Sequence, residues 1–368
     1  MDCRSPTHTS GGAASFTAPP TACAGFLPCR LNSVLRMGLR RAERFVENRK
    51  QGSSGMRMTT IRRAAALGVL APVLAACGGL NRSAANPRTF DGVARHVVVI
   101  SVDGLRADAI EAAGAANLQR MMREGAWSLR AQTIMPSRTL PSHTSMITGQ
   151  PPEVHGITFN DERVDAEGRV TVPTMFDVAD KAGLYTAAYF AKAKFRHLIH
   201  PNAPDDVEAP RGLEVVMAPR MTQDVVQFLQ FRRPDLLFVH IPDPDIAGHS
   251  VGWMSTPYRW AVRRADAAVE QIRRAAVRTF GDDVVVIVTA DHGGHGRDHG
   301  SDSPEDMTIP WIAWGTGVKP GRIETPIRTF DTAATTLWLL GVEVPADWAG
   351  RPVESAFTRP AAVAAPAP

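Results

Sequence analysis

Three segments of the sequence carry carboxylate and imidazole groups of the kind that bind metal ions, and each follows an apolar run. The candidates are Asp103 after residues 97–101; Asp245 and His249 after residues 235–241; and Asp291, His292, His295 and His299 after residues 283–290. Such runs predict parallel strands buried on both faces, and sheets of this kind place their ligands at the carboxyl ends of the strands. Carboxylates gathered at one edge repel one another unless cations neutralise them. Mixed oxygen and nitrogen ligands favour Zn²⁺, although manganese or iron would also fit.

A hydroxyl group suited to nucleophilic attack lies in the segment 135–143. Pro141 fits the first turn of a helix that would run to Gly149, so Thr139 is expected at or just before its N-terminus. Unpaired N–H groups and the helix dipole favour an anion there. A neighbouring metal ion could also ionise the hydroxyl. The alternative is that Thr139 only caps the helix.

Strand-like and helix-like segments alternate between residues 95 and 358, which predicts one α/β catalytic domain over that range. The expected strands are 97–101, 185–190, 235–241, 283–290 and 309–314, and the expected helices are 117–124, 174–182, 221–231, 257–279 and 332–340. The predicted architecture is a doubly wound, mostly parallel central sheet with helices on both faces.

Charge is divided unevenly along the 368 residues, whose formal net charge is +4. Residues 1–76 hold 11 Lys and Arg against 3 Asp and Glu, whereas the rest holds 30 against 34. The expected domain therefore lacks the basic footprint of a nucleic-acid-binding protein, and no nucleic-acid partner is expected. All four cysteines lie at or before Cys77, so no disulfide can brace the expected domain.

Residues 58–76 have the pattern of a bacterial lipoprotein signal peptide. Arg62 and Arg63 precede the apolar run 64–76, which is shorter than the ~20 residues that span a bilayer. The run ends in Leu-Ala-Ala-Cys77, which resembles a lipobox whose cysteine is lipidated. We expect a periplasmic protein anchored to the membrane through Cys77; the alternative is a buried alanine-rich helix.

The remaining segments outside the expected domain have compositions typical of irregular chain. Residues 1–57 lack apolar periodicity, and either they form a disordered extension or the chain starts at Met56 or Met58. Residues 77–94 are expected to be a flexible tether, and the Ala- and Pro-rich residues 359–368 a disordered tail.

Taken together, the motifs resemble the alkaline phosphatase superfamily, most closely its type I phosphodiesterase/nucleotide pyrophosphatase family, over residues 97–353. The matching motifs are Asp103-Gly104; Thr139-Leu140-Pro141-Ser142-His143 with Thr148-Gly149; His155-Gly156-Ile157-Thr158-Phe159-Asn160; Asp245 through Gly248-His249; Asp291-His292-Gly293; and His299-Gly300-Ser301-Asp302. The resemblance implies hydrolysis of a phosphodiester or pyrophosphate bond in a small-molecule substrate.

The same resemblance implies a site with two divalent ions, zinc first among the candidates. One ion would be held by Asp245, His249 and His299, and the other by Asp103, Asp291 and His292. Thr139 would lie between the ions as the nucleophile and form a phosphothreonine intermediate, and Asn160 would donate a hydrogen bond to a nonbridging phosphoryl oxygen.

Two departures from the family pattern affect the substrate site. Leu140 stands where the family commonly has an aromatic residue that stacks on a base, which weakens the case for nucleotides. Only six residues separate His292 from His299, so the cap is reduced and any lid should come from about residues 191–219. The short spacing also makes His295 a rival ligand, although Gly300-Ser301-Asp302 after His299 favours His299.

The basic side chains of the expected lid have two interpretations. Lys192, Lys194, Arg196 and His197 could contact an anionic substrate. A solvated basic face is the interpretation we favour from the sequence.

Three other functions compete with the diesterase. A phosphomonoesterase would use the same two ions but needs extra positive groups near the nucleophile, where only Arg138 is evident. A sulfatase of the usual mechanism is excluded, because threonine cannot be converted to formylglycine. A lipoprotein that keeps the fold without catalysis is disfavoured because the ligand positions and Thr139 are all intact.

Overall fold

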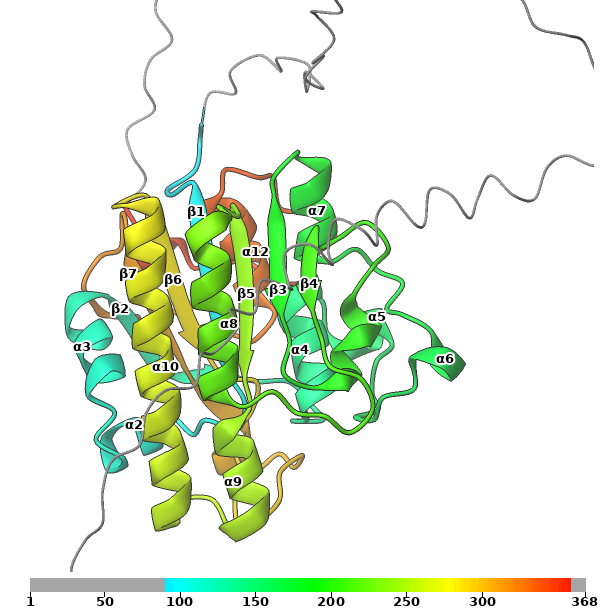
Figure 1. Cartoon of the computed structure of the whole chain (residues 1–368), viewed down its shortest axis with the longest axis vertical. Helices are drawn as coiled ribbons and strands as arrows, with labels where there is room; N and C mark the ends of the chain where they lie inside the picture. The colour runs from blue at the N-terminus through cyan, green and yellow to red at the C-terminus, as the bar shows by residue number, and fades with distance from the viewer. Residues whose placement is uncertain (1–89, 359–368) are drawn as a thin grey trace, which may run out of the picture. The chain divides into compact units, whose positions relative to one another are not determined.

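The computed structural model describes residues 90–358, which all belong to one of two compact units, residues 82–368 (Figure 1). The expected N-terminal extension, the signal segment, Cys77, most of the tether and the tail 359–368 lie outside the described residues. Within residues 90–358, no helix has both the length and the apolar character needed to cross a membrane.

An eight-stranded sheet forms the centre of the described part, in the order β4-β3-β5-β1-β6-β7-β2-β8. The strands are β1 (His96–Val102), β2 (Ala126–Gln132), β3 (Thr186–Tyr189), β4 (Asp206–Glu208), β5 (Leu236–Ile241), β6 (Val284–Thr289), β7 (Thr308–Gly315) and β8 (Gly321–Arg322). Only β7 runs antiparallel to its neighbours, β6 and β2. The predicted mostly parallel sheet is therefore confirmed.

Helices cover both faces of the sheet, as predicted (Figure 1). One face carries α2 (Ala109–Ala112), α3 (Ala116–Glu124), α8 (Ala218–Phe231), α9 (Asp243–Val251) and α10 (Thr256–Phe280), and the other carries α4 (Thr139–Thr148), α7 (Met175–Lys181) and α12 (Asp331–Leu339). Short helices complete the order: α5 (Pro152–His155), α6 (Val164–Glu167), η1 (Ala193–Leu198), α11 (Pro304–Met307) and η2 (Glu354–Ala356).

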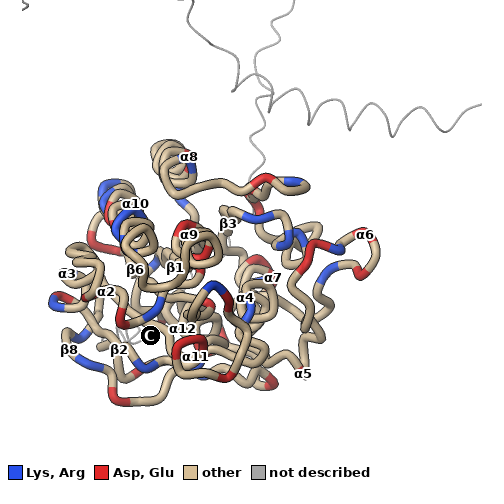
Figure 2. The backbone as a smooth tube through the Cα atoms, turned by 90° about the horizontal axis from the view of Figure 1, so that it is seen from below, with Lys and Arg blue, Asp and Glu red and all other residues tan. Residues whose placement is uncertain are grey.

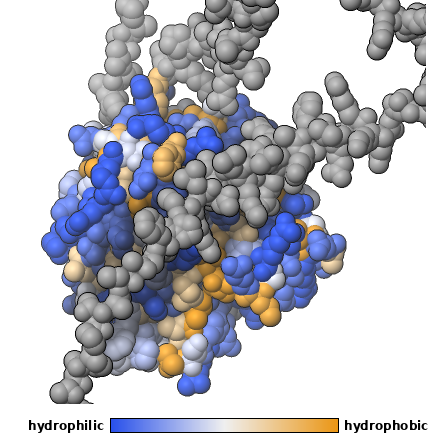
Figure 3. Space-filling view, in the orientation of Figure 1, coloured by the Kyte–Doolittle hydropathy of each residue, from blue (hydrophilic) through white to orange (hydrophobic). Residues whose placement is uncertain are grey.

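The core lies between the three central strands and the helices on either side. Every residue of β5 and β6 is buried, and so is all of β1 except His96, which explains their uninterrupted apolar sequences. In α10, one face packs on the sheet and the other is charged; Figure 3 shows hydrophilic side chains over its outer side. Glu270 of this helix pairs with three arginines, Arg120, Arg273 and Arg274.

The packed part of the chain begins before residue 95, where the sequence placed the end of the tether. Val93 and Ala94 are buried, and both of their N–H groups donate to the carbonyl of Leu339 at the end of α12. These contacts fix the chain as it enters β1.

Candidate active site

The three central parallel strands deliver the expected metal ligands to one edge of the sheet. Asp103 follows β1, Asp291 and His292 follow β6, and α9 after β5 carries Asp245 and His249. Because β5, β1 and β6 are adjacent and parallel, their carboxyl ends meet. Figure 2 views the molecule from this side, with α9 above the sheet edge.

Backbone contacts lock these strand ends together. The N–H of Asp245 donates to the carbonyl of Asp103 at 3.0 Å, and the N–H of Gly104 donates to Asp291 Oδ1 at 3.1 Å. Gly104 has φ +69°, and a Cβ added there would lie 2.9 Å from Cα of Asp245. The Asp-Gly pair is thus needed for the turn and for the close approach of α9.

The first group of candidate ligands surrounds Nε2 of His292. Asp103 Oδ1, Asp291 Oδ2 and Thr139 Oγ1 each lie 3.3 Å from this nitrogen. The ligand atoms of Asp103, Asp291 and His292 are close enough to one another to hold a single ion. All three side chains are buried.

The second group lies beside the first. His249 is one helical turn after Asp245, and its Nε2 is 3.3 Å from Asp245 Oδ1. His299 Nε2 lies 3.1 Å from His249 Nε2 and 3.6 Å from Asp245 Oδ1. The structure therefore brings together the residues that the resemblance grouped. The side chain of His249 is 43% exposed and opens this group to solvent.

The three histidines share an orientation suited to metal binding. Each donates its Nδ1–H to a backbone carbonyl, because a carbonyl can only accept. The acceptors for His249, His292 and His299 are the carbonyls of Arg297, Gly293 and Ser137, at 3.0, 2.8 and 2.9 Å. Nε2 of each ring is thereby turned toward the other candidate ligands, which is how outer contacts orient metal-binding histidines.

The carboxylates are arranged in the same way, with one oxygen held by the protein and the other turned inward. Asp103 Oδ1, Asp245 Oδ1 and Asp291 Oδ2 are buried and have no hydrogen-bond partner among the described residues. Unpaired buried carboxylate oxygens are costly unless a cation meets them. The donor set of carboxylate oxygens and imidazole nitrogens fits divalent ions such as Zn²⁺.

Thr139 is the first residue of α4, as the sequence predicted. Its side chain is buried, and its hydroxyl faces His292 in the first group. The helix ends at Gly149, with φ +66°, where Trp348 packs so closely that an added Cβ would lie 2.2 Å from its ring. Packing at its far end therefore fixes the helix that presents the hydroxyl.

Asn160 lies beside the nucleophile. Its Oδ1 accepts a hydrogen bond from the N–H of Leu140 at 2.9 Å, so the side-chain NH₂ remains the group that can donate to another acceptor. The preceding loop is held by His155, whose Nδ1 accepts from the N–H of Ile157 at 3.1 Å. Burial lowers the pKa of His155 to about 4, which keeps this acceptor neutral.

Two residues of the site were missed by sequence reasoning. Lys192 was expected on a solvated face, and this expectation is wrong: its Nζ lies 2.6 Å from both Asp103 Oδ2 and Asp245 Oδ2. His240 in β5 contacts Asp103 Oδ2 at 3.0 Å. Its Nδ1 accepts from the N–H of Ala191, so its Nε2 donates. A histidine inside an apolar strand was the available signal for His240.

Electrostatics keep the two carboxylates beside Lys192 ionised. Burial alone would raise the pKa of Asp103, but the Lys192 ammonium and the His240 hydrogen bond hold it well below its usual range. Burial and the Asp103 charge raise the pKa of Asp245, and the ammonium and His249 reverse that shift to a net lowering. Burial lowers the pKa of His240 to about 4, so it donates as a neutral ring.

The other candidate side chains lie away from the two groups. His295 is half exposed, and its Nδ1 contacts Asp306 Oδ1 at 2.8 Å, which leaves His299 as the histidine that faces His249. Arg196 pairs with Glu162, and His197 is buried against the carbonyl of Gly168.

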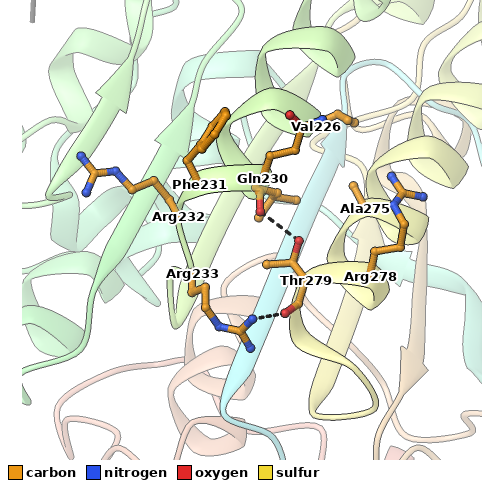
Figure 4. Close-up of a pocket in the computed structure, with 9 residues that line it drawn as sticks. Val226, Gln230, Phe231, Arg232, Arg233, Ala275, Arg278 and Thr279 are labelled. Carbon is orange, nitrogen blue, oxygen red and sulfur yellow. Dashed lines mark hydrogen bonds between the residues drawn. The ribbon is translucent and has the colours of Figure 1, made fainter. Parts of the chain in front are cut away.

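A separate surface cavity of about 440 Å³ lies at the C-terminal ends of α8 and α10, where β5 and β6 begin (Figure 4). This is the opposite edge of the sheet from the ligand groups. Arg232, Arg233 and Arg278 are among its lining residues, and Arg233 is tied to the carbonyl of Thr279. Its lining residues include no carboxylate and no histidine.

Comparison with known proteins bears out the resemblance. The sequence model of the family described as type I phosphodiesterase/nucleotide pyrophosphatase matches residues 97–300, more than half of the chain. The chain belongs to this family. The family indicates hydrolysis of phosphodiester or pyrophosphate bonds, or transfer of a phosphoryl group. The matched range contains every metal-ligand and nucleophile candidate described above.

Relatives of known activity are distant and mostly longer. Human GPI ethanolamine phosphate transferase 1 is 25% identical over 67% of this chain and 29% of its own length. Human ectonucleotide pyrophosphatase/phosphodiesterase family member 7 is 23% identical over 56% of this chain and 49% of its own length. The chain therefore spans less than a third of the first relative and about half of the second.

Solved structures share the fold. Murine ectonucleotide pyrophosphatase/phosphodiesterase 5, an inactive variant in complex with AMP, matches with a TM-score of 0.61 and 16% identity, over 72% of this chain and 100% of that chain. A 2-O GAG sulfatase matches with a TM-score of 0.58 and 16% identity, over 72% and 75%.

Proposed function

We propose that this protein is a metal-dependent hydrolase that cleaves phosphodiester or pyrophosphate bonds of small molecules through a phosphothreonine intermediate at Thr139. One observation carries the proposal: the Thr139 hydroxyl lies 3.3 Å from His292 Nε2, next to buried carboxylate oxygens that have no hydrogen-bond partner among the described residues. A hydroxyl in such a place can act as a nucleophile once it is deprotonated.

The ligand groups would hold two divalent ions, preferably zinc, with Asp245, His249 and His299 around one and Asp103, Asp291 and His292 around the other. When bound, such ions lower the pKa of a nearby hydroxyl and stabilise charge on the entering and leaving oxygens. The chain itself supplies the geometry, because the outer contacts of each histidine and carboxylate are already made.

The remaining steps use groups of the chain. Thr139 Oγ1 attacks phosphorus, forming the Oγ1–P bond as the bond to the leaving oxygen breaks. The N-terminus of α4 favours the negative charge of the phosphoryl group, and the Asn160 NH₂ donates to a nonbridging oxygen. Water then attacks phosphorus and releases the Thr139 hydroxyl; attack by an alcohol instead would make the reaction a transfer.

A substrate pair tests the proposal. Purified protein is assayed with bis-p-nitrophenyl phosphate and p-nitrophenyl phosphate, as isolated, after chelation, and after addition of Zn²⁺ or Mn²⁺. We expect diester turnover that chelation abolishes and added metal restores. No turnover of either compound by metal-loaded protein refutes the hydrolase, and a strong preference for the monoester makes it a phosphomonoesterase.

We also propose that the protein is exported and held at the membrane of the bacterial periplasm by a lipid on Cys77. The support is the charged and apolar pattern of residues 58–76 followed by the lipobox-like sequence. Cys77→Ala should move the protein from the membrane fraction to the soluble fraction. Mass analysis of the N-terminal peptide should find the lipid on Cys77 of the wild type; an unmodified cysteine there refutes the anchor.

A further inference from the structure

A single ammonium group joins the two ligand groups. Lys192 follows β3 and immediately precedes η1. Its Nζ lies 2.6 Å from Oδ2 of Asp103, in the first group, and 2.6 Å from Oδ2 of Asp245, in the second. Its side chain is only 12% exposed. A lysine is rarely buried to this degree unless it is paired, so the two contacts account for its position.

The ammonium contacts the outer oxygens and leaves the inner ones free. Oδ1 of Asp103 and Oδ1 of Asp245, which face the imidazoles, have no hydrogen-bond partner in the described part of the chain. The lysine and an ion bound by the imidazoles would thus use different oxygens of the same carboxylates. Lys192 can stay in place while the site is loaded.

The two aspartates differ from Asp291 in what holds the outer oxygen. Asp291 Oδ1 accepts from two backbone N–H groups, at 3.1 and 3.0 Å. Among residues 90–358, Lys192 is the only hydrogen-bond donor to Asp245 Oδ2, and Asp103 Oδ2 has His240 as well. Without the lysine, Asp245 Oδ2 would lose the one hydrogen-bond donor that the described residues give it. The two buried carboxylates of Asp103 and Asp245 would also lose the positive charge that they share.

We propose that Lys192 acts as a built-in cation: its ammonium contacts one carboxylate of each ligand group and neutralises their charge when no metal is bound. The same charge repels incoming metal ions. Lys192 therefore stabilises the metal-free protein more than the metal-loaded protein. This inference rests on the proposed function only in treating the two groups as metal sites.

A thermodynamic consequence follows from linkage. If Lys192 stabilises the metal-free state more than the loaded state, its removal must raise metal affinity by the corresponding factor, because the couplings are reciprocal. A factor on the order of 10 is expected for charges in such close contact. A residue that merely filled space would stabilise both states equally and leave metal affinity unchanged.

Lys192→Met tests this, since methionine has similar length and no charge. Lys192→Arg keeps the charge, and Lys181→Met removes an exposed lysine at the end of α7 as the control. Each full-length variant is stripped with chelator and titrated with Zn²⁺ alone, against a competing chromophoric chelator. Melting temperature is measured with and without saturating Zn²⁺.

We expect Lys192→Met to melt lower than the wild type when metal-free, to recover most of that loss with Zn²⁺, and to bind Zn²⁺ about tenfold more tightly. Lys192→Arg and Lys181→Met should stay close to the wild type in both measurements. If Lys192→Met unfolds on chelation, the loaded proteins are compared: a melting temperature with saturating Zn²⁺ close to that of the loaded wild type supports the inference, and one far below it overturns the inference.

Equal destabilisation of the metal-free and loaded states, or unchanged or weaker Zn²⁺ binding in Lys192→Met, overturns the inference. Neither readout depends on turnover. A wild type that binds Zn²⁺ but hydrolyses nothing would therefore refute the proposed function alone, whereas an active wild type with an unresponsive Lys192→Met would refute only the role of the lysine.

Discussion

Replacement of Thr139 by alanine separates the chemistry of the site from its architecture. The hydroxyl is the proposed nucleophile, yet the described residues give it only one long hydrogen bond, 3.3 Å to His292 Nε2. Alanine is also a good helix former at the first position of α4. We therefore expect a folded protein that cannot form the covalent intermediate.

The expected loss of stability is small and the expected loss of activity is large, so the two effects of Thr139→Ala can be told apart. Loss of one long hydrogen bond should lower the free energy of unfolding by about 1 kcal/mol or less, a shift in melting temperature of about 2–4 °C for a domain of this size. Loss of a nucleophile lowers kcat by a factor on the order of 10⁴ to 10⁶. Thr139→Ser keeps the hydroxyl and should retain activity within about a hundredfold of the wild type.

The assay is hydrolysis of bis-p-nitrophenyl phosphate by metal-loaded protein, with bound metal quantified in each variant. Metal content should be nearly unchanged in Thr139→Ala. Acid-quenched wild type should also carry a p-nitrophenyl phosphoryl group on Thr139, detectable by peptide mass. Thr139→Ala with more than about a hundredth of wild-type kcat would falsify covalent catalysis at this residue, because no other route to such a rate is proposed.

Three further outcomes are expected. Asn160→Ala should lower kcat about 10- to 1,000-fold with metal content unchanged, since one donor to the phosphoryl oxygen is lost; an unaltered kcat contradicts the role. Burial raises the pKa of Glu270, but its arginine partners, led by Arg273, lower that pKa to about 2. The ionised side chain therefore stabilises the fold at pH values above 4.5, the ordinary pKa of the group, and this stabilisation is lost as the pH falls toward 2. Urea unfolding across this window should show a weaker pH dependence for Glu270→Gln. Gly149→Ala should cost about 2–4 kcal/mol in thermal or urea unfolding, from the positive φ and the tryptophan ring 2.2 Å from the new Cβ. Gly114→Ala is the control, because Gly114 has φ +65° with open space around it, so this variant should lose only the backbone contribution of about 1–2 kcal/mol. An equal loss of unfolding free energy in Gly114→Ala and Gly149→Ala would exclude a steric clash with the tryptophan ring.

Local pattern predicted the elements that carry strong periodicity. The buried strands β1, β5 and β6 and the amphipathic helix α10 occur within one or two residues of their expected bounds. Strand β2, with its mixed sequence, and α9, which begins Asp-Pro-Asp, were not anticipated. Such segments take their conformation from tertiary contacts, in the case of α9 from the bond between the Asp245 N–H and the carbonyl of Asp103.

The residues of the candidate site also fall into two classes, those that sequence motifs predicted and those that only tertiary contacts revealed. The motifs named Asp103, Thr139, Asp245 and the histidines because their residue types and order are visible in the chain. Nothing local marked Lys192 as different from Lys194, two positions later, although only Lys192 contacts the carboxylates of the site. Its partner Asp103 is 89 positions away, and no periodicity records a contact over that distance.

By itself, the sequence determined the chemical groups available to this protein and the strands that carry most of them to one edge of a sheet. Only the tertiary structure decided which oxygen of each carboxylate is held and which is turned inward, which ring nitrogen faces the centre, and that an ammonium joins the two halves. Composition and spacing set what a side chain can do, whereas burial and the direction of its neighbours, which depend on distant parts of the chain, set what it is placed to do.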